Sequence, residues 1–149
     1  MRFWDTSALV PLLVDQETTG AVRATYGAAS IVVAWTTIVE CASAVARAER
    51  ESFVSSDAAT LAFGRLDELA RIWREVEPSS DLRDVARRLL RMHRLRAADA
   101  IQLAAAILAA ERRPASLTVV TLDERLETAA LKEGFPVLVP GRAPAARGE

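Results

Sequence analysis

Short apolar runs alternate with helical patterns along this chain, and that alternation constrains the fold more than any other feature. The runs have the length and the flanking turn residues of buried strands, and the later ones are rich in β-branched side chains. They cover residues 2–4, 31–34, 117–121 and 136–139, with a weaker fifth run near 75–77. Strands that alternate with helices form a parallel sheet with helices on both faces. The sequence therefore predicts an α/β fold with a central parallel sheet.

The helical segments show apolar residues at the spacing of one helix face. Ile38, Cys41, Ala42 and Val45 follow the i, i+3, i+4, i+7 pattern. Further periodic segments cover 61–72, 81–92 and 101–108, and the apolar stripe of the second is Leu82, Val85, Leu89 and Met92. Gly134 follows Lys132 and Glu133, which predicts that the last helix stops there.

The composition bounds the class of protein. A chain of 149 residues, 51% of them hydrophobic, fits one domain with its own core. The net charge of −1 does not predict a protein that coats nucleic acid. The single cysteine, Cys41, excludes an internal disulfide and fits a cytoplasmic location. No apolar run reaches the ~18 residues of a membrane helix, and the first residues lack a signal peptide's apolar region, so we expect no membrane association.

The last residues carry a different composition. Residues 141–149 are mostly Gly, Ala, Pro and Arg, and they show no apolar period. We expect a disordered C-terminal tail there. The folded domain is therefore predicted to cover residues 1–140.

Several kinds of active site are excluded by residue counts. His93 is the only histidine, and it lies in a basic helical segment away from any nucleophile signal, so we expect no catalytic triad. One cysteine and one histidine cannot make a Cys/His zinc site. Neither of the two glycine-rich phosphate-binding motifs is present. Any catalysis must therefore come from carboxylates.

Four carboxylates stand at unusual positions. Asp5 ends the first predicted strand, and Asp123 follows the fourth. Glu40 lies in the helix after the second strand, and Asp99 opens a helix that is apolar on almost all sides, interrupted only by Gln102. A carboxylate at the mouth of a buried helix needs a partner, and the nearest cation in sequence is Arg96.

Each acid also has an ordinary structural explanation. Asp5 fits a helix N-cap. The pair Thr121 and Glu124 fits a capping box, with Asp123 as an acid in the first turn. Glu40 fits a solvated helix face, which would be made with Thr36, Ser43 and Arg47.

The predicted topology favours a shared role for these acids. Ligands of an open parallel sheet bind outside the carboxyl ends of its strands, where Asp5 and Asp123 lie. The helices that carry Glu40 and Asp99 would begin at the same edge. Carboxylates that converge repel one another unless a cation holds them. Oxygen ligands without histidine or cysteine favour Mg²⁺ or Mn²⁺, and such an ion activates water for attack on a phosphodiester.

Four segments stand in order along the chain: DTSALV at 5–10, TTIVECASAVARAER at 36–50, LRAADAIQLAAA at 95–106 and VVTLDERLETAALKEGFPVLVP at 119–140. Together they resemble the PIN-domain family, and within it the VapC toxins of type II toxin–antitoxin systems. The resemblance covers residues 1 to about 140. It implies an α/β/α sandwich with a sheet of five strands and a Mg²⁺-dependent ribonuclease.

The resemblance also implies an acidic pocket of Asp5, Glu40, Asp99 and Asp123. The hydroxyls of Thr6, Ser7 and Thr121 would be secondary ligands or would hold water. A cognate antitoxin that covers the pocket and a homodimer are implied as partners. Many relatives have histidine where this chain has Gln102, and a basic residue where it has Pro11, so contacts with substrate are expected to differ.

A basic strip precedes Asp99. Arg83, Arg87, Arg91 and Arg94 recur at spacings of four, four and three, and Arg96 follows. Arginine binds phosphate well because its planar group donates two parallel hydrogen bonds. We expect contacts between this strip and an RNA backbone; the alternatives are a solvated helix face and pairing with Asp81 or Asp84.

Three functions follow from the sequence. The leading one is a Mg²⁺-dependent endoribonuclease toxin that leaves 5′-phosphate and 3′-hydroxyl ends. A receiver-like signalling domain is disfavoured because Asp5 is on the first strand and Lys132 is the only lysine. A PIN-like module that binds RNA or a partner without cutting remains the alternative. The homodimer is expected to form through residues 36–73, with apolar anchors at Phe53, Leu61, Phe63, Leu66, Leu69 and Trp73.

Overall fold

Five parallel strands form the central sheet in the computed structural model, which describes residues 1–27 and 29–143. They are β1 (Arg2–Trp4), β2 (Ile31–Ala34), β3 (Arg74–Val76), β4 (Thr118–Val120) and β5 (Val137–Leu138). Their order in the sheet is β3-β2-β1-β4-β5, and every pairing is parallel. The predicted α/β fold with a central parallel sheet is confirmed.

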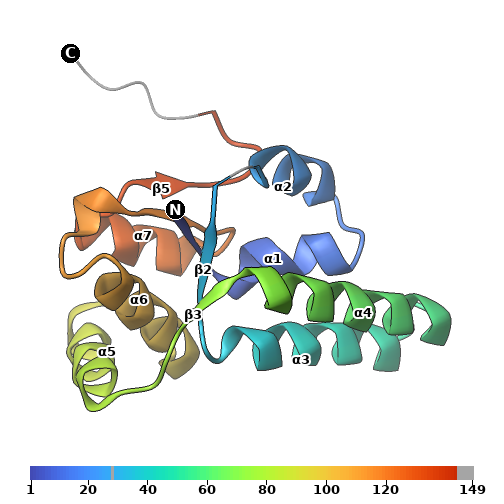
Figure 1. The fold of residues 1–149 in the computed structure, drawn as a ribbon, viewed down its shortest axis with the longest axis horizontal. Helices are drawn as coiled ribbons and strands as arrows, with labels where there is room; N and C mark the ends of the chain where they lie inside the picture. The colour runs from blue at the N-terminus through green and yellow to red at the C-terminus, as the bar shows by residue number, and fades with distance from the viewer. Residues whose placement is uncertain (28, 144–149) are drawn as a thin grey trace.

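Helices cover both faces of this sheet (Figure 1). They are α1 (Thr6–Leu13), α2 (Thr19–Thr25), α3 (Thr37–Arg50), α4 (Ser56–Ile72), α5 (Ser80–Met92), α6 (Ala97–Ala109) and α7 (Glu124–Lys132), with a short 3₁₀ turn at Pro114–Ser116. The long helices α3 and α4 pack side by side, as α5 and α6 do on the opposite side of the sheet. Within the described ranges, no helix has both the length and the apolar character to span a membrane.

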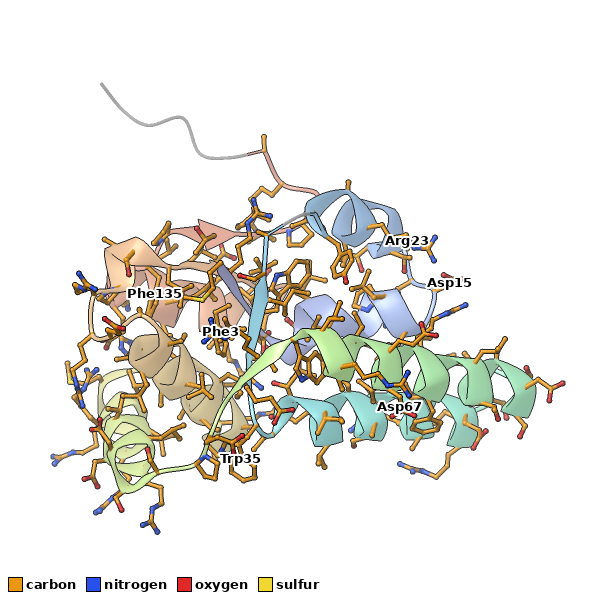
Figure 2. All side chains as sticks on the ribbon, viewed as in Figure 1. Phe3, Asp15, Arg23, Trp35, Asp67 and Phe135 are labelled. Atoms are coloured by element: carbon orange, nitrogen blue, oxygen red, sulfur yellow. The ribbon has the colours of Figure 1, made fainter. Side chains whose placement is uncertain are left out.

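Alternation along each strand divides the core into two layers. Phe3 packs into the core with α5, α6 and α7, whereas its neighbour Trp4 packs into the core with α1, α3 and α4. Val119 and Val120 of β4 divide between the two layers in the same way. Because successive side chains of a strand point to opposite faces, a strand of three residues serves both cores. Figure 2 shows Phe3 at the centre of the molecule.

Side chains at the helix ends fix where several helices begin. The Ser79 hydroxyl accepts a hydrogen bond from Leu82 N at 3.0 Å, and the Ser55 hydroxyl accepts one from Ala58 N at 3.1 Å. These bonds satisfy backbone donors that a helix start leaves free. Gly134 follows α7 with a φ of +94°, which glycine adopts without steric cost, so the predicted helix stop is confirmed.

Helix α5 corrects two details of the predicted basic segment. The helix ends at Met92, because His93 adopts an extended backbone with φ −135° and ψ 157°. Arg94 therefore lies beyond the helix and does not share a helical face with Arg91. Met92 was predicted on the apolar stripe, but it is exposed, and Ala86 is buried beside Leu82, Val85 and Leu89 instead.

The chain continues past β5 for a few described residues. Arg142 N donates to Val139 O at 3.0 Å, and the Arg142 guanidinium pairs with Glu127 on α7. The rest of the predicted tail, residues 144–149, lies outside the described residues. The domain boundary at residue 140 stays a prediction.

Candidate active site

Asp5 stands where β1 ends and α1 begins, at the carboxyl edge of the sheet. Its side chain is buried, with 4% of the residue exposed. Asp5 Oδ2 accepts hydrogen bonds from Ser7 N at 3.3 Å, from Thr121 Oγ1 at 2.9 Å and from the Ser7 hydroxyl. All hydrogen bonds that the described residues donate to this carboxylate reach Oδ2. The N-cap role is therefore real, and it uses only one of the two oxygens.

The electrostatic environment of Asp5 opposes its ionisation. Burial raises the pKa of Asp5 from 3.8 to about 6, and the negative charges of Asp123 and Glu40 push the pKa in the same direction. The hydrogen bonds from Ser7 and Thr121 lower it and only partly compensate. A nearby cation would favour the ionised form.

Ser7 and Thr121 tie the loop after β4 to Asp5. Ser7 Oγ accepts a hydrogen bond from Leu122 N at 2.9 Å, and Thr121 Oγ1 accepts one from Asp123 N at 3.0 Å. The alternative of a capping box that begins at Thr121 is wrong, because Asp123 is itself the N-cap of α7. The Thr121 hydroxyl instead fixes the two aspartates relative to each other.

Asp99 and Asp123 line one surface pocket. It has a volume of about 420 Å³, and its lining residues are Arg96, Asp99, Leu122, Asp123, Glu124 and Arg125. Asp123 Oδ1 accepts a hydrogen bond from Leu126 N at 2.8 Å, and Asp99 Oδ2 accepts one from Arg96 N at 3.2 Å. Each aspartate thus engages one oxygen at the start of its helix, as Asp5 does. The partner that Arg96 supplies to Asp99 is its backbone N–H.

Neighbouring carboxylates also affect the pKa of Asp99. Its pKa is raised by burial first, and then by the charges of Asp123 and Glu40. The backbone hydrogen bond from Arg96 and the charge of its guanidinium lower the pKa. Asp123 and Glu40 thus act on the pKa of both Asp5 and Asp99.

Glu40 lies on the first turns of α3 and faces inward. Its Oε2 accepts a hydrogen bond from Thr6 Oγ1 at 3.0 Å, and its Oε1 accepts one from Gln102 Nε2 at 3.1 Å. The alternative of an ordinary solvated helix residue does not describe Glu40, whose carboxylate contacts α1 and α6. Unlike the three aspartates, this carboxylate has both of its oxygens held by side chains from other elements.

The donor set fits a hard cation. It consists of carboxylate oxygens, and Asp5, Asp99 and Asp123 each keep one oxygen to which the described residues donate no hydrogen bond. Mg²⁺ and Mn²⁺ favour such ligands. Within residues 1–27 and 29–143, however, no three His, Cys, Asp or Glu side chains already stand close enough to hold one ion. The carboxylates in the described residues are therefore not gathered around one point.

The predicted arginine strip divides among several surface hollows. Arg83 and Arg87 line an apolar pocket of about 690 Å³ beside Trp35, at the start of α3 (Figure 2). Arg91 and Arg94 line another of about 500 Å³, and Arg96 lies at the acidic pocket. Among the described residues, no arginine of the strip forms a salt bridge with Asp81 or Asp84, and Asp81 pairs with Arg112 instead.

Sequence reasoning assigned no site role to three residues. Gln102 and Thr37 are buried beside Glu40, and Arg125 lines the acidic pocket. Gln102 had a signal, since it is the only polar residue in the apolar run of its helix. Thr37 and Arg125 had none.

Comparisons with known proteins agree with this fold. The toxin–antitoxin complex from Klebsiella pneumoniae contains a chain 17% identical, with a TM-score of 0.65 over 96% of this chain and 100% of that one. FitAcB from Neisseria gonorrhoeae gives 19% identity and a TM-score of 0.63 over 93% and 96%. The structure of FitAB bound to an IR36 DNA fragment contains a chain that is 16% identical, with a TM-score of 0.68 over 99% of this chain and 100% of that one. At these identities the likeness concerns the fold alone.

Sequence comparison identifies the family, which the structural likeness alone does not. No curated protein matches the chain significantly. The model of the PIN domain matches residues 2–132, which include all four acids and every strand except β5. The chain belongs to the PIN domain family.

Proposed function

We propose that this protein is a metal-dependent endoribonuclease and the VapC-like toxin of a toxin–antitoxin pair. The observation that carries the proposal is the state of the three aspartates. Each comes from a different part of the chain, uses one oxygen to cap a helix, and keeps the other oxygen without a hydrogen bond from the described residues. Burial and mutual repulsion raise the pKa of Asp5 and of Asp99, which a divalent cation would counter.

The proposed roles follow from these contacts. Asp5, Asp99, Asp123 and Glu40 would hold Mg²⁺, with Mn²⁺ as a substitute, and Glu40 would also orient the attacking water. A bound divalent ion supplies charge neutralisation at the phosphate and activates water. Ser7 and Thr121 keep Asp5 in place, and Thr6 holds one oxygen of Glu40.

The proposed substrate is RNA, positioned by arginines at the rim of the acidic edge. Arg96 and Arg125 line the acidic pocket, whereas Arg83 and Arg87 line a second pocket, and Arg91 and Arg94 line a third. Such contacts with phosphate fix position and carry no sequence information. The solved chains of similar fold support an antitoxin as the partner, and the absence of any cysteine pair supports a cytoplasmic location.

The direct test is cleavage of RNA by purified protein with Mg²⁺, with Mn²⁺ and with EDTA. We expect cleavage only with metal, 3′-hydroxyl ends, and no cleavage by Asp5→Asn. Full cleavage in EDTA, or 2′,3′-cyclic phosphate ends, would contradict the proposal. RNA binding without cleavage under any metal condition would favour the alternative, a non-cleaving PIN-like module.

We also propose a homodimer, with fewer anchors than the sequence indicated. Leu66 and Trp73 are buried in the core of the subunit, so they are not available to a partner. Phe53 and Leu61 are 77% and 63% exposed, and they remain as anchors on the α3–α4 pair. Sedimentation at micromolar concentration should give a dimer, and Phe53→Ser with Leu61→Ser should give a monomer. A monomeric wild-type protein would reject the dimer.

A further inference from the structure

A buried amide lies behind the acidic edge and has no role in the function proposed above. Gln102 belongs to α6, and only 1% of the residue is exposed. Its Nε2 lies 3.1 Å from Glu40 Oε1, 3.2 Å from Thr6 Oγ1 and 3.0 Å from Thr37 Oγ1. One side chain of α6 therefore contacts α1 and α3 at the point where both deliver groups to the site.

The hydrogen bonds around this amide are unequally distributed. Nε2 carries two hydrogens but faces three acceptors. Gln102 Oε1 is buried and has no hydrogen-bond partner among the described residues. A buried acceptor without a donor costs free energy, so an opposing interaction must keep the amide in this orientation.

Glu40 supplies that interaction. If the amide turned over, Oε1 would face Glu40 Oε1 at about the 3.1 Å that now separates Nε2 from it, and two oxygen acceptors would repel. The charge-assisted hydrogen bond from Nε2 to Glu40 is stronger than a hydrogen bond from a neutral donor to Oε1 would be. The amide therefore keeps Nε2 toward Glu40 and leaves Oε1 without a donor. The carboxylate thus orients the amide, and the amide in turn holds the carboxylate.

Glu40 is locked from both sides as a result. Gln102 holds Oε1 and Thr6 holds Oε2, while Gln102 also donates toward the Thr6 hydroxyl. The three residues form a closed ring of hydrogen bonds that joins α1, α3 and α6. The flanking elements carry Asp5, which precedes α1, and Asp99, which lies one turn before Gln102 on α6. The ring therefore fixes the relative position of the elements that carry three of the four acids.

We propose that Gln102 is a positioning residue, which prepares the acidic edge for a divalent cation by holding Glu40 and by locking α6 against α1 and α3. This inference rests on the proposed function. The purely structural alternative is that Gln102 only fills space in the core. Under that alternative, a side chain of the same shape would serve equally well.

Three variants separate these possibilities. Gln102→Met keeps the length of the side chain and removes its hydrogen bonds, and Leu103→Met is the matched control at the adjacent buried position, which is 1% exposed. Thr37→Val removes one of the two hydroxyl acceptors that compete with Glu40 for the amide hydrogens, and it leaves the Thr6 hydroxyl in place. Melting temperatures of the metal-free proteins report any general loss of stability.

The main readout is Mn²⁺ affinity, measured by electron paramagnetic resonance without RNA. Replacing residues that orient metal ligands typically weakens metal binding by about 10–100-fold, and we expect a loss of that order for Gln102→Met. Leu103→Met and Thr37→Val should bind Mn²⁺ like the wild type. In RNA cleavage at saturating Mg²⁺, Gln102→Met should lower kcat and leave KM for RNA unchanged.

The failures of the two proposals are distinguishable. Equal Mn²⁺ affinity in the wild type and Gln102→Met would overturn the role of Gln102 and leave the metal-dependent nuclease standing. A wild type that binds no Mn²⁺ would overturn the nuclease. The ring is then tested by NMR on the Gln102 side-chain amide, whose signals are identified by their loss in Gln102→Met. Signals that do not shift in Glu40→Ala would overturn the contact itself.

Discussion

Replacing Asp5 with asparagine should stabilise the metal-free protein at neutral pH, although it removes a proposed metal ligand. Asparagine has the same shape, and its carbonyl oxygen accepts the hydrogen bonds from Ser7 and Thr121 that Oδ2 accepts now. What disappears is a charge that burial and two neighbouring carboxylates disfavour. The variant should therefore gain free energy of unfolding wherever the wild-type carboxyl is ionised.

The size and the sign of the effect follow from the pKa of Asp5. Between pH 3.8 and about 6 the unfolded chain releases a proton that the folded protein retains, so the wild type loses stability as the pH rises through this window. The full loss is ~3 kcal/mol, at 1.36 kcal/mol per pH unit. When the proton uptake of the folded and unfolded states is integrated over pH, ~2 kcal/mol of this loss in free energy of unfolding falls between pH 4.5 and 7.5. For a domain of this size, that corresponds to ~4–8 °C in melting temperature.

Urea unfolding of both proteins in EDTA at pH 4.5, 6 and 7.5 measures this difference. Other carboxylates titrate in both proteins, so the informative quantity is the gap between Asp5→Asn and wild type at each pH. Asp67→Asn is the control, because Asp67 is exposed on α4 (Figure 2). Mg²⁺ at 100 times its Kd should stabilise the wild type by ~2.7 kcal/mol and close much of the gap. A gap that stays constant with pH would refute the reasoning.

Three further outcomes are expected. Asp99→Asn should abolish cleavage and raise the melting temperature of the metal-free protein, but by less than Asp5→Asn, because Asp99 is only half-buried; a lower melting temperature would show that the acids do not repel. Arg87→Ala and Arg91→Ala should raise KM with little change in kcat, and each should flatten the salt dependence of RNA binding to Asp5→Asn protein by about 0.7; an unchanged slope would remove the strip from the RNA-binding surface. Glu133→Gln should lower stability at pH 7 by at most about 1 kcal/mol, because Glu133 accepts from Arg88 at 3.0 and 3.1 Å and this contact holds its pKa low, but the Arg88 side chain is 48% exposed and solvent screens the pair. The wild type should lose this contribution as the pH falls through the lowered pKa, so the two stability curves should converge in acid, and curves that stay parallel would reject the link.

The sequence alone determined the α/β class and the positions of Asp5 and Asp123 after strands β1 and β4. Strands that are buried on both faces leave apolar runs, and helices between them leave a different period, so the alternation can be read without coordinates. Asp5 and Asp123 follow such runs directly, and parallel strands bring their carboxyl ends to one edge. Local pattern was sufficient because these features depend on neighbours in the chain.

Tertiary structure decided which side of each helix meets a partner. Leu66 and Trp73 resembled surface anchors, yet both are buried, whereas Met92 resembled a core residue and is exposed. A helical period gives an apolar face, but the partner element determines how wide a stripe it covers. The end of α5 was also beyond sequence reasoning, because no proline or glycine marks the extended backbone at His93.

The ring around Glu40 depended most on the tertiary structure. Gln102 donates to residues that are 96, 65 and 62 positions away in the chain. The sequence marked Gln102 as an interruption of an apolar helix, and Glu40 as one acid on a polar face, but nothing local connected them. These hydrogen bonds between elements exist only after α1, α3 and α6 have packed, because that packing sets the distance between each donor and its acceptor.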